Sequence, residues 1–426
     1  MSLAAFQVRS FRFQFSADLL TSWAVEMEVV ILGWYVMVQT GSVLMLTVFG
    51  SLQFLGTLAA PMFGVLGDRL GSRFMLCVMR GTYAFLALAL MTLGFAGVLA
   101  PAHVLVAAAL VGIFRPNDMV MRNALIGATI PPGHLIGALG MSRATQDSAR
   151  IAGALAGASL SATAGISVAY VFVSLFYLAS LALTSQVSRG LAGPDPASGA
   201  DHAGARLSGM PRSSSWRDLV DGLAYVWNEP RLLAAMWLAF LVNLCAYPLS
   251  GGLLPYVAKT VYGADAQGLG WLVASFSLGA LAGSALMTVT GGARNPERSM
   301  VVTVLLWYAL LAVFGLARSL PAGIVVLAVT GLVQSVAMIS MAGSLLRASG
   351  ARFRGRVMGV RTLAVYGLPL GLMASGALVD RIGYTPTVTL YAVTGILFSA
   401  LIALRWRAHV WQGGAPVRPL AASPAE

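Results

Sequence analysis

The stretch GVLGDRLGSRFM, residues 64–75, decides how the rest of the chain is interpreted, because it sets charges and glycines between two long apolar runs. Its notable residues are three glycines, one acid and two bases: Gly64, Gly67, Gly71, Asp68, Arg69 and Arg73. Glycine permits tight turns and close helix approach. Arginine collects in the cytoplasmic loops of membrane proteins. The stretch therefore predicts a short charged connector between two membrane-spanning helices.

The composition supports a membrane protein. Of 426 residues, 58% are hydrophobic and only 10% are charged, whereas soluble domains carry about 25% charged residues. The formal net charge of +12 comes almost wholly from arginine, since Lys259 is the only lysine. In a soluble protein this charge would suggest nucleic acid, but here we interpret it as arginine held in cytoplasmic loops and expect no nucleic-acid partner.

Twelve apolar runs account for most of the chain. They lie near residues 15–38, 43–66, 74–97, 102–124, 141–163, 167–188, 232–257, 267–290, 299–317, 321–346, 357–379 and 386–405. A spanning helix needs about 20 residues, whereas a barrel strand needs about ten alternating ones. We therefore predict an all-α integral membrane protein with twelve transmembrane helices in two pseudo-symmetric six-helix halves. The first run exceeds a signal peptide's apolar core, so we expect it to be retained.

Arginine placement and a polar linker set the topology. Most arginines fall on the side that holds the N-terminus, which predicts that both termini are cytoplasmic. Residues 189–230, rich in Gly, Pro and Ser, are predicted as a cytoplasmic linker that ends in a short amphipathic helix. The first half is then 1–188, the second half 231–408, and residues 409–426 form a cytoplasmic tail.

A weak internal repeat supports two related halves. In one gapless alignment of the sequence with itself, here called the first shift, Gly67 falls on Gly291. In a second gapless alignment with a slightly smaller offset, here called the second shift, Gly165 falls on Gly383 and the Gly140–Arg143 region falls near Met358–Arg361. Repeats at matching topological positions are typical of secondary transporters.

The connector resembles the G-x-x-x-D-R-x-G-R-R signature that the major facilitator superfamily carries between its second and third helices. The sequence departs from that pattern at Ser72, which stands where a second arginine is common. The resemblance implies the major facilitator fold and a conformational latch formed by the connector. The branch it resembles includes bacterial exporters such as the enterobactin exporter and macrolide efflux proteins.

The fifth run contains RIAGALAGASL, residues 150–160, which resembles the glycine-rich antiporter motif of proton-coupled drug exporters. Gly153 and Gly157 have GxxxG spacing, while Ala154 replaces the usual proline. The alternative is that these small residues only allow close helix packing.

Ionisable residues within the apolar runs are candidates for coupling or substrate binding, because charge is costly in lipid. The first run holds Asp18, Glu26 and Glu28. At about 100° per residue, Glu26 and Glu28 point to nearly opposite faces, so we expect only one to face a given cavity. The alternative is that such an acid pairs with an arginine or sits near an interface.

The fourth and fifth runs hold a cluster of charged residues: Arg115, Arg122, Arg143, Asp147 and Arg150. Arg143 and Asp147 are four residues apart and can form an intrahelical pair. Arg115 is an alternative contact for an anionic substrate. Candidate cavity walls in the second half are Asn243, Tyr247, Pro248, Trp271, Gln334 and Ser335.

These observations predict a secondary transporter of a bacterial inner membrane that works as a monomer by alternating access. The resemblance to bacterial exporters implies that the activity is proton-coupled efflux of small amphipathic compounds, drug or siderophore-like, driven by the proton gradient without a cofactor. Uptake of a small metabolite is the alternative. A membrane enzyme or receptor is a third reading, but the sequence lacks clustered His or acid motifs, metal-ligand spacing and a GxxxxGK[ST] loop.

Overall fold

The computed structural model describes residues 6–57, 60–130, 135–188, 215–349 and 354–411. Every regular element within these ranges is a helix, which confirms the predicted all-α fold. Ten of the helices found there are long and apolar enough to cross a membrane. The predicted linker up to residue 214 and the tail beyond residue 411 lie outside the described residues.

The first half contains six passes. Its elements are α1 (Arg9–Thr40), α2 (Val43–Leu52), η2 (Leu55–Thr57), α3 (Ala60–Leu70), α4 (Ser72–Phe95), α5 (Pro101–Thr129) and α6 (Leu135–Ser185). The second pass is divided among α2, η2 and α3, and none of these three helices is long enough to cross a membrane alone. It is nevertheless the apolar run predicted for residues 43–66.

Helix α6 supplies two passes because the chain reverses at Gly165. This residue has φ 80° and ψ 169°, a conformation that is essentially restricted to glycine. The two arms are antiparallel, since Gly153 of the first arm packs near Glu26 of α1, whereas Ser180 of the second arm donates to the carbonyl of Ala17. Both arms therefore enclose α1.

The second half contains the other six passes. Its elements are α8 (Pro230–Leu241) with η5 (Val242–Ala246), η6 (Pro248–Gly252), α9 (Leu254–Tyr256) and η7 (Val257–Val261), then α10 (Ala266–Val289), α11 (Pro296–Leu316), α12 (Leu320–Ala348), α13 (Arg354–Leu363) with η8 (Ala364–Tyr366) and α14 (Gly367–Ile382), and α15 (Tyr384–Arg405). Helix α7 (Ser215–Asn228) is the amphipathic helix expected at the end of the linker, and α16 (Arg407–Val410) follows α15. The twelve predicted spans are thus accounted for.

The seventh pass is wider than an ordinary α-helix. Pro248 and Pro255 cannot donate a backbone hydrogen bond. Pro248 begins the π-helical segment η6, and Pro255 lies between η6 and η7. Leu253 donates to the carbonyl of Pro248 over 3.0 Å, which is the longer-range bond of a π-helix. Such π-segments are frequent at functional sites, and this one borders the cavity described below.

The two halves repeat each other in backbone detail. Gly383 has φ 86° and ψ 170°, nearly the values at Gly165, its partner in the second shift. A β-carbon at Gly112 would lie 2.0 Å from the carbonyl oxygen of Leu52, and one at Gly331 would lie 1.9 Å from that of Phe276. The first shift places Leu52 on Phe276, so the same helix crossing occurs in both halves.

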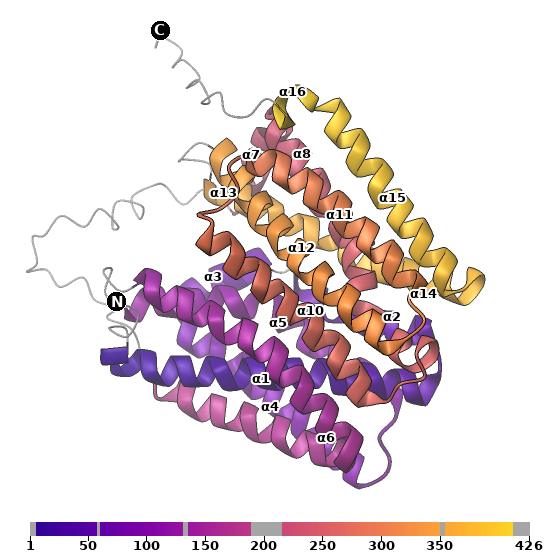
Figure 1. Ribbon diagram of the computed structural model, residues 1–426. Coiled ribbons are helices and arrows are strands. Elements are labelled where there is room, and N and C mark those ends of the chain that lie inside the picture. The colour runs from indigo at the N-terminus through magenta and orange to yellow at the C-terminus, as the bar shows by residue number, and fades with distance from the viewer. Residues whose placement is uncertain (1–5, 58–59, 131–134, 189–214, 350–353, 412–426) are drawn as a thin grey trace, which may run out of the picture.

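The halves meet at one end of the bundle. We name the ends by the two termini of α1, the Arg9 end and the Thr40 end. At the Thr40 end Lys259 donates to the carbonyl of Met37 over 2.9 Å. Figure 1 shows the first half, indigo to magenta, beside the second half, rose-red through orange to yellow, with α2 reaching α14.

Candidate functional site

A cavity of about 840 Å³ lies between the two halves. Its wall comes from α1, α2, α5 and α6 of the first half and from the seventh, eighth, tenth and eleventh passes of the second. Drug-sized ligands occupy pockets of roughly 300–1,000 Å³. The cavity is therefore large enough for a compound of several rings.

Apolar contacts close the cavity toward the Thr40 end. A β-carbon at Gly33 would lie 3.4 Å from Pro255, and one at Gly50 would lie 3.3 Å from Leu372. Ser51 adds a hydrogen bond of 3.1 Å to the carbonyl of Pro369. The charged part of the lining lies farther toward the Arg9 end, because Arg143 follows closely after the start of α6.

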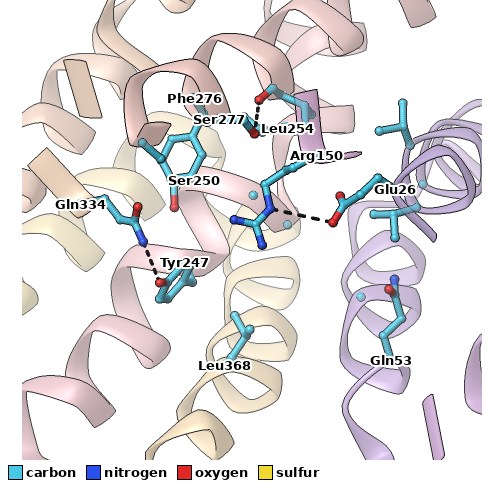
Figure 2. Close-up of a pocket in the computed structure, with 18 of the residues that line it drawn as sticks. Glu26, Gln53, Arg150, Tyr247, Ser250, Leu254, Phe276, Ser277, Gln334 and Leu368 are labelled. Carbon is cyan, nitrogen blue, oxygen red and sulfur yellow. Dashed lines mark hydrogen bonds and ion pairs between the residues drawn. The ribbon is translucent and has the colours of Figure 1, made fainter. Parts of the chain in front are cut away.

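The charged residues of the lining are four arginines and two acids: Arg115, Arg143, Arg150, Arg361, Glu26 and Asp147. Arg150 Nε lies 3.8 Å from Glu26 Oε1, and this pair joins α6 to α1 across the cavity wall. Figure 2 shows Arg150 between Glu26 on one side and the polar groups of the second half on the other.

Arg143 and Asp147 form the intrahelical pair that the sequence predicts, with Nε and Oδ2 3.9 Å apart. The Arg143 side chain is 59% exposed, so the pair contributes little to stability. Both side chains also line the cavity.

The second half contributes a polar part of the cavity wall, and no acidic residue is found among the described residues of this part. Gln334 donates a hydrogen bond of 2.9 Å to the hydroxyl of Tyr247, and both residues line the cavity with Ser250 (Figure 2). Ser335 belongs to the same lining. The Tyr247 ring packs edge-on against buried Trp307, with centroids 5.2 Å apart, which holds its hydroxyl toward Gln334.

Three expected wall residues do not line the cavity. Asn243 donates to the carbonyl of Ala239 within its own helix. Pro248 is buried in the core, and Trp271 is 49% exposed on the surface of α10. These expectations were wrong because the rotation of a helix about its axis depends on its neighbours and not on its own sequence alone.

Glu28 points away from the main cavity, on the face of α1 opposite to Glu26. Its carboxylate accepts hydrogen bonds from the hydroxyls of Tyr177 (2.8 Å) and Tyr170 (3.2 Å) on the second arm of α6. Glu28 and Arg115 share a small adjoining pocket, where Arg115 donates to the side chain of Gln53. Glu28 is thus fixed by tyrosines, while Arg115 reaches both spaces.

Asp18 does not line the cavity either. It is 1% exposed and forms ion pairs with Arg80 of α4 and Arg122 of α5, and Arg122 also pairs with Asp118. Thr184 accepts a further hydrogen bond from Arg80. Two acids and two bases therefore neutralise each other inside the first half. The sequence analysis did not identify Arg80 or Asp118, although each lies within an apolar run and is costly unless paired.

Gly153 and Gly157 pack α6 against α1. A β-carbon at Gly157 would lie 2.8 Å from the α-carbon of Met27, and one at Gly153 would lie 3.1 Å from the β-carbon of Glu26. The GxxxG spacing therefore lets the first arm of α6 approach α1 closely and fixes the position of Glu26. Its role in antiport stays a prediction.

The charged connector lies at the Arg9 end. Gly71 separates α3 from α4 with φ 87°, and Arg69 is exposed. Arg73 donates to the backbone carbonyl of Ser185 at the end of α6, which joins two passes of the same half. The side chain of Asp68 and the surroundings of Gly64 lie outside the described residues, so the latch stays a prediction.

No group of three or more metal-ligating side chains is found in the described ranges. Cys77 is half-buried and Cys245 is buried, and they do not form a disulfide.

Two repeated six-helix halves that enclose a cavity with charged and apolar walls define a class of membrane transporter. The family model of the Major Facilitator Superfamily matches residues 15–265 and again residues 236–424. The chain therefore belongs to the Major Facilitator Superfamily. It is a multi-pass membrane transporter of small molecules and not an enzyme.

Curated relatives include the multidrug efflux pump Tap of Mycobacterium bovis (strain BCG / Pasteur 1173P2) and of Mycobacterium tuberculosis (strain ATCC 25618 / H37Rv). Each is 28% identical over 308 residues, which cover 70% of this chain and 69% of the relative. This similarity supports an efflux transporter.

Solved structures confirm the fold. A bacterial homologue of the human lysosomal transporter Spinster, in an inward-facing and unoccupied conformation, superposes with a TM-score of 0.67 at 14% identity and covers 93% of this chain and 95% of its own. The nucleoside transporter NupG gives a TM-score of 0.67 at 13% identity, covering 94% and 98%. A POT family transporter in complex with 5-aminolevulinic acid gives 0.70 at 12% identity, covering 94% and 96%.

Proposed function

We propose that this protein exports small amphipathic compounds in exchange for protons by alternating access. The observation that carries the proposal is the amphipathic cavity of about 840 Å³, which holds Glu26 opposite Arg150 on its wall. Acids within the membrane are expensive and usually functional. The similarity to the multidrug efflux pump Tap supports the outward direction.

The Arg9 end is proposed to face the cytoplasm of a bacterial cell. Arg9, Arg73, Arg294 and Arg405 lie at this end, whereas the Thr40 end holds little more than Lys259 and two arginines. This distribution fits the positive-inside rule. The contacts at the Thr40 end then make this arrangement the inward-facing one, from which a compound would be collected.

Glu26 is the proposed proton carrier. Its carboxylate is held near Arg150 while it is ionised, and protonation removes that attraction. Because Gly153 packs against the Glu26 β-carbon, a change in the pair would act directly on the contact between α1 and α6. Proton binding is thereby linked to movement of two helices that line the cavity.

The predicted latch would form in the outward-facing conformation, in which the Arg9 end is closed. When the Arg9 ends of the halves close, the connector of residues 64–75 would contact the second half. Asp68 would accept hydrogen bonds there, and Arg69, exposed in the present arrangement, would gain a partner. Closing and opening of this contact would alternate with the contacts at the Thr40 end.

Uptake is the competing direction, because the fold is shared with the nucleoside transporter NupG. Inside-out vesicles distinguish the two directions. We expect that compounds from a panel of amphipathic antibiotics and dyes will collapse a preformed pH gradient and accumulate in vesicles that contain the protein. Accumulation that is absent for every compound, or that needs no proton gradient, would contradict proton-coupled efflux.

The Glu26→Gln variant tests the carrier in the same vesicles. It should bind compounds but no longer couple them to the pH gradient. Glu297→Gln is the matched control, since Glu297 lies in the first turn of α11 and does not line the cavity. Equal coupling in the Glu26→Gln variant and the wild type would show that Glu26 is not the carrier.

A further inference from the structure

The cavity has an excess of positive charge. Its lining contains four arginines against two carboxylates and includes neither lysine nor histidine. The excess is therefore two formal positive charges within the part of the wall that the structure describes. A cavity that held cations would be expected to have the opposite balance.

The two acids are already associated with two of the arginines. Glu26 lies 3.8 Å from Arg150, and Asp147 lies 3.9 Å from Arg143. Arg115 and Arg361 have no ion pair among the described residues: Arg115 donates to the neutral side chain of Gln53, and Arg361 is half-buried on α13. Glu28 lines the small adjoining pocket together with Arg115, and two tyrosines already donate to the Glu28 carboxylate.

Arg115 and Arg361 come from opposite halves of the protein, on α5 and α13. A guanidinium group presents a planar fork of donors that matches a carboxylate. Each half thus contributes to the cavity wall one guanidinium group that forms no ion pair among the described residues. Such groups attract an anion in the cavity and repel a cation.

The rest of the wall suits an apolar ring system. Phe49, Phe54 and Phe276 line the cavity together with Leu254 and Met338. Aromatic and methionine side chains contact flat apolar ligands without strict directionality. The cavity therefore offers a cationic region and an apolar region side by side.

We propose that the transported compounds are amphipathic carboxylates: an apolar aromatic body that carries an acid group, bound between Arg115 and Arg361. This inference rests on the proposed function and specifies the substrate class of the same cavity. It assigns Arg361 as a specificity-determining residue. Cationic compounds of the same size are excluded by charge and not by shape.

A matched set of probes tests the charge preference by binding, independently of transport. The probes are 1-pyrenebutyrate, its neutral amide and its trimethylammonium analogue, which share one ring system. The full-length protein in detergent is heated with each probe, and the fraction that stays folded is measured by size-exclusion chromatography, because a ligand that binds the native state stabilises it. We expect stabilisation by the carboxylate at concentrations about tenfold lower than by the amide, and none by the cation.

Variants of Arg361 separate charge from folding. Arg361→Gln should weaken binding of the carboxylate about tenfold or more, as for loss of a charged hydrogen bond, and leave the amide unchanged. Arg361→Lys should restore part of the preference. Arg381→Gln is the matched control, because Arg381 is an exposed arginine at the Thr40 end outside the cavity.

Equal stabilisation by the three probes, no stabilisation by the carboxylate, or a preference that survives in the Arg361→Gln variant would overturn the inference. These outcomes differ from failure of the proposed function, which would appear as absent proton-coupled accumulation in vesicles while the carboxylate still binds.

Discussion

Gly270 on α10 lies at the seam between the halves and offers a direct test of how the Thr40 end closes. A β-carbon at Gly270 would lie 2.5 Å from the β-carbon of Ala158 on α6. The β-carbon of Ala158 is fixed to the backbone, so no change of rotamer can relieve the overlap. In the Gly270→Ala variant the two helices must separate.

The size of the effect follows from packing. Overpacking a close contact costs typically about 1–3 kcal/mol, and here the cost applies only while the Thr40 end is closed. The ratio of outward-open to inward-open protein should therefore rise by roughly fivefold to over a hundredfold. Without the Ala158 β-carbon, the nearest atom is the carbonyl oxygen of Ala154 at 3.6 Å, an ordinary contact.

Val43→Cys reports this opening. Val43 is 3% exposed and packs in the core cluster that joins the halves at the Thr40 end. In a background without Cys77 and Cys245, a membrane-impermeant maleimide added from the Thr40 side should label Val43→Cys faster when Gly270→Ala is present.

Two controls make the test specific. Gly81→Ala should leave labelling unchanged, because a β-carbon at Gly81 would meet no atom within 4 Å. Ala158→Gly combined with Gly270→Ala should restore the slow labelling of the parent. If Gly270→Ala labels no faster than Gly81→Ala, the proposed seam does not limit opening.

Three further predictions concern residues outside the cavity. Asp68→Asn should slow transport without lowering the amount of inserted, folded protein, and transport at the wild-type rate would refute the latch. Asp18→Asn leaves Arg80 and Arg122 buried with one acid fewer, and loss of a buried pair costs about 3–5 kcal/mol, so the thermal unfolding temperature should fall; an unchanged temperature would show that the cluster is not stabilising. Gly165→Ala should cost about 1–3 kcal/mol because of its backbone conformation, and an equally stable variant in thermal unfolding would contradict a required turn there.

The fold could be predicted because each span is encoded locally. A run of about 20 apolar residues specifies a membrane helix wherever it occurs, and the second shift already paired Gly165 with Gly383. The structure then gives both glycines nearly the same dihedral angles. The break in the second pass was not visible in the sequence, because the whole run of residues 43–66 is apolar. The reversal at Gly165, in contrast, falls between the fifth and sixth predicted runs.

Residues of the site could be predicted from the sequence only where the geometry of a single helix determines the direction of their side chains. The rotation of about 100° per residue separated Glu26 from Glu28, and the structure places them on opposite faces of α1, one in the cavity and one against tyrosines. Asp18 was grouped with them because its partners are distant in sequence. Arg80 belongs to another helix, so the pairing depends on how α4, α5 and α6 pack together around α1. Arg361 was noted in the sequence only as part of the internal repeat. Its place in the cavity wall depends on how α13 packs against other helices, which the sequence of α13 alone does not reveal.

The central claim is that the two halves open alternately onto one cavity, and pulsed electron paramagnetic resonance tests it most directly. One pair of spin labels, at Ala128 and Arg294, reports the separation of the halves at the Arg9 end, and another, at Ala96 and Ile382, reports it at the Thr40 end. Between low and high pH the account predicts opposite changes, with one distance lengthening as the other shortens. Distances that stay fixed, or that lengthen together, would contradict alternating access.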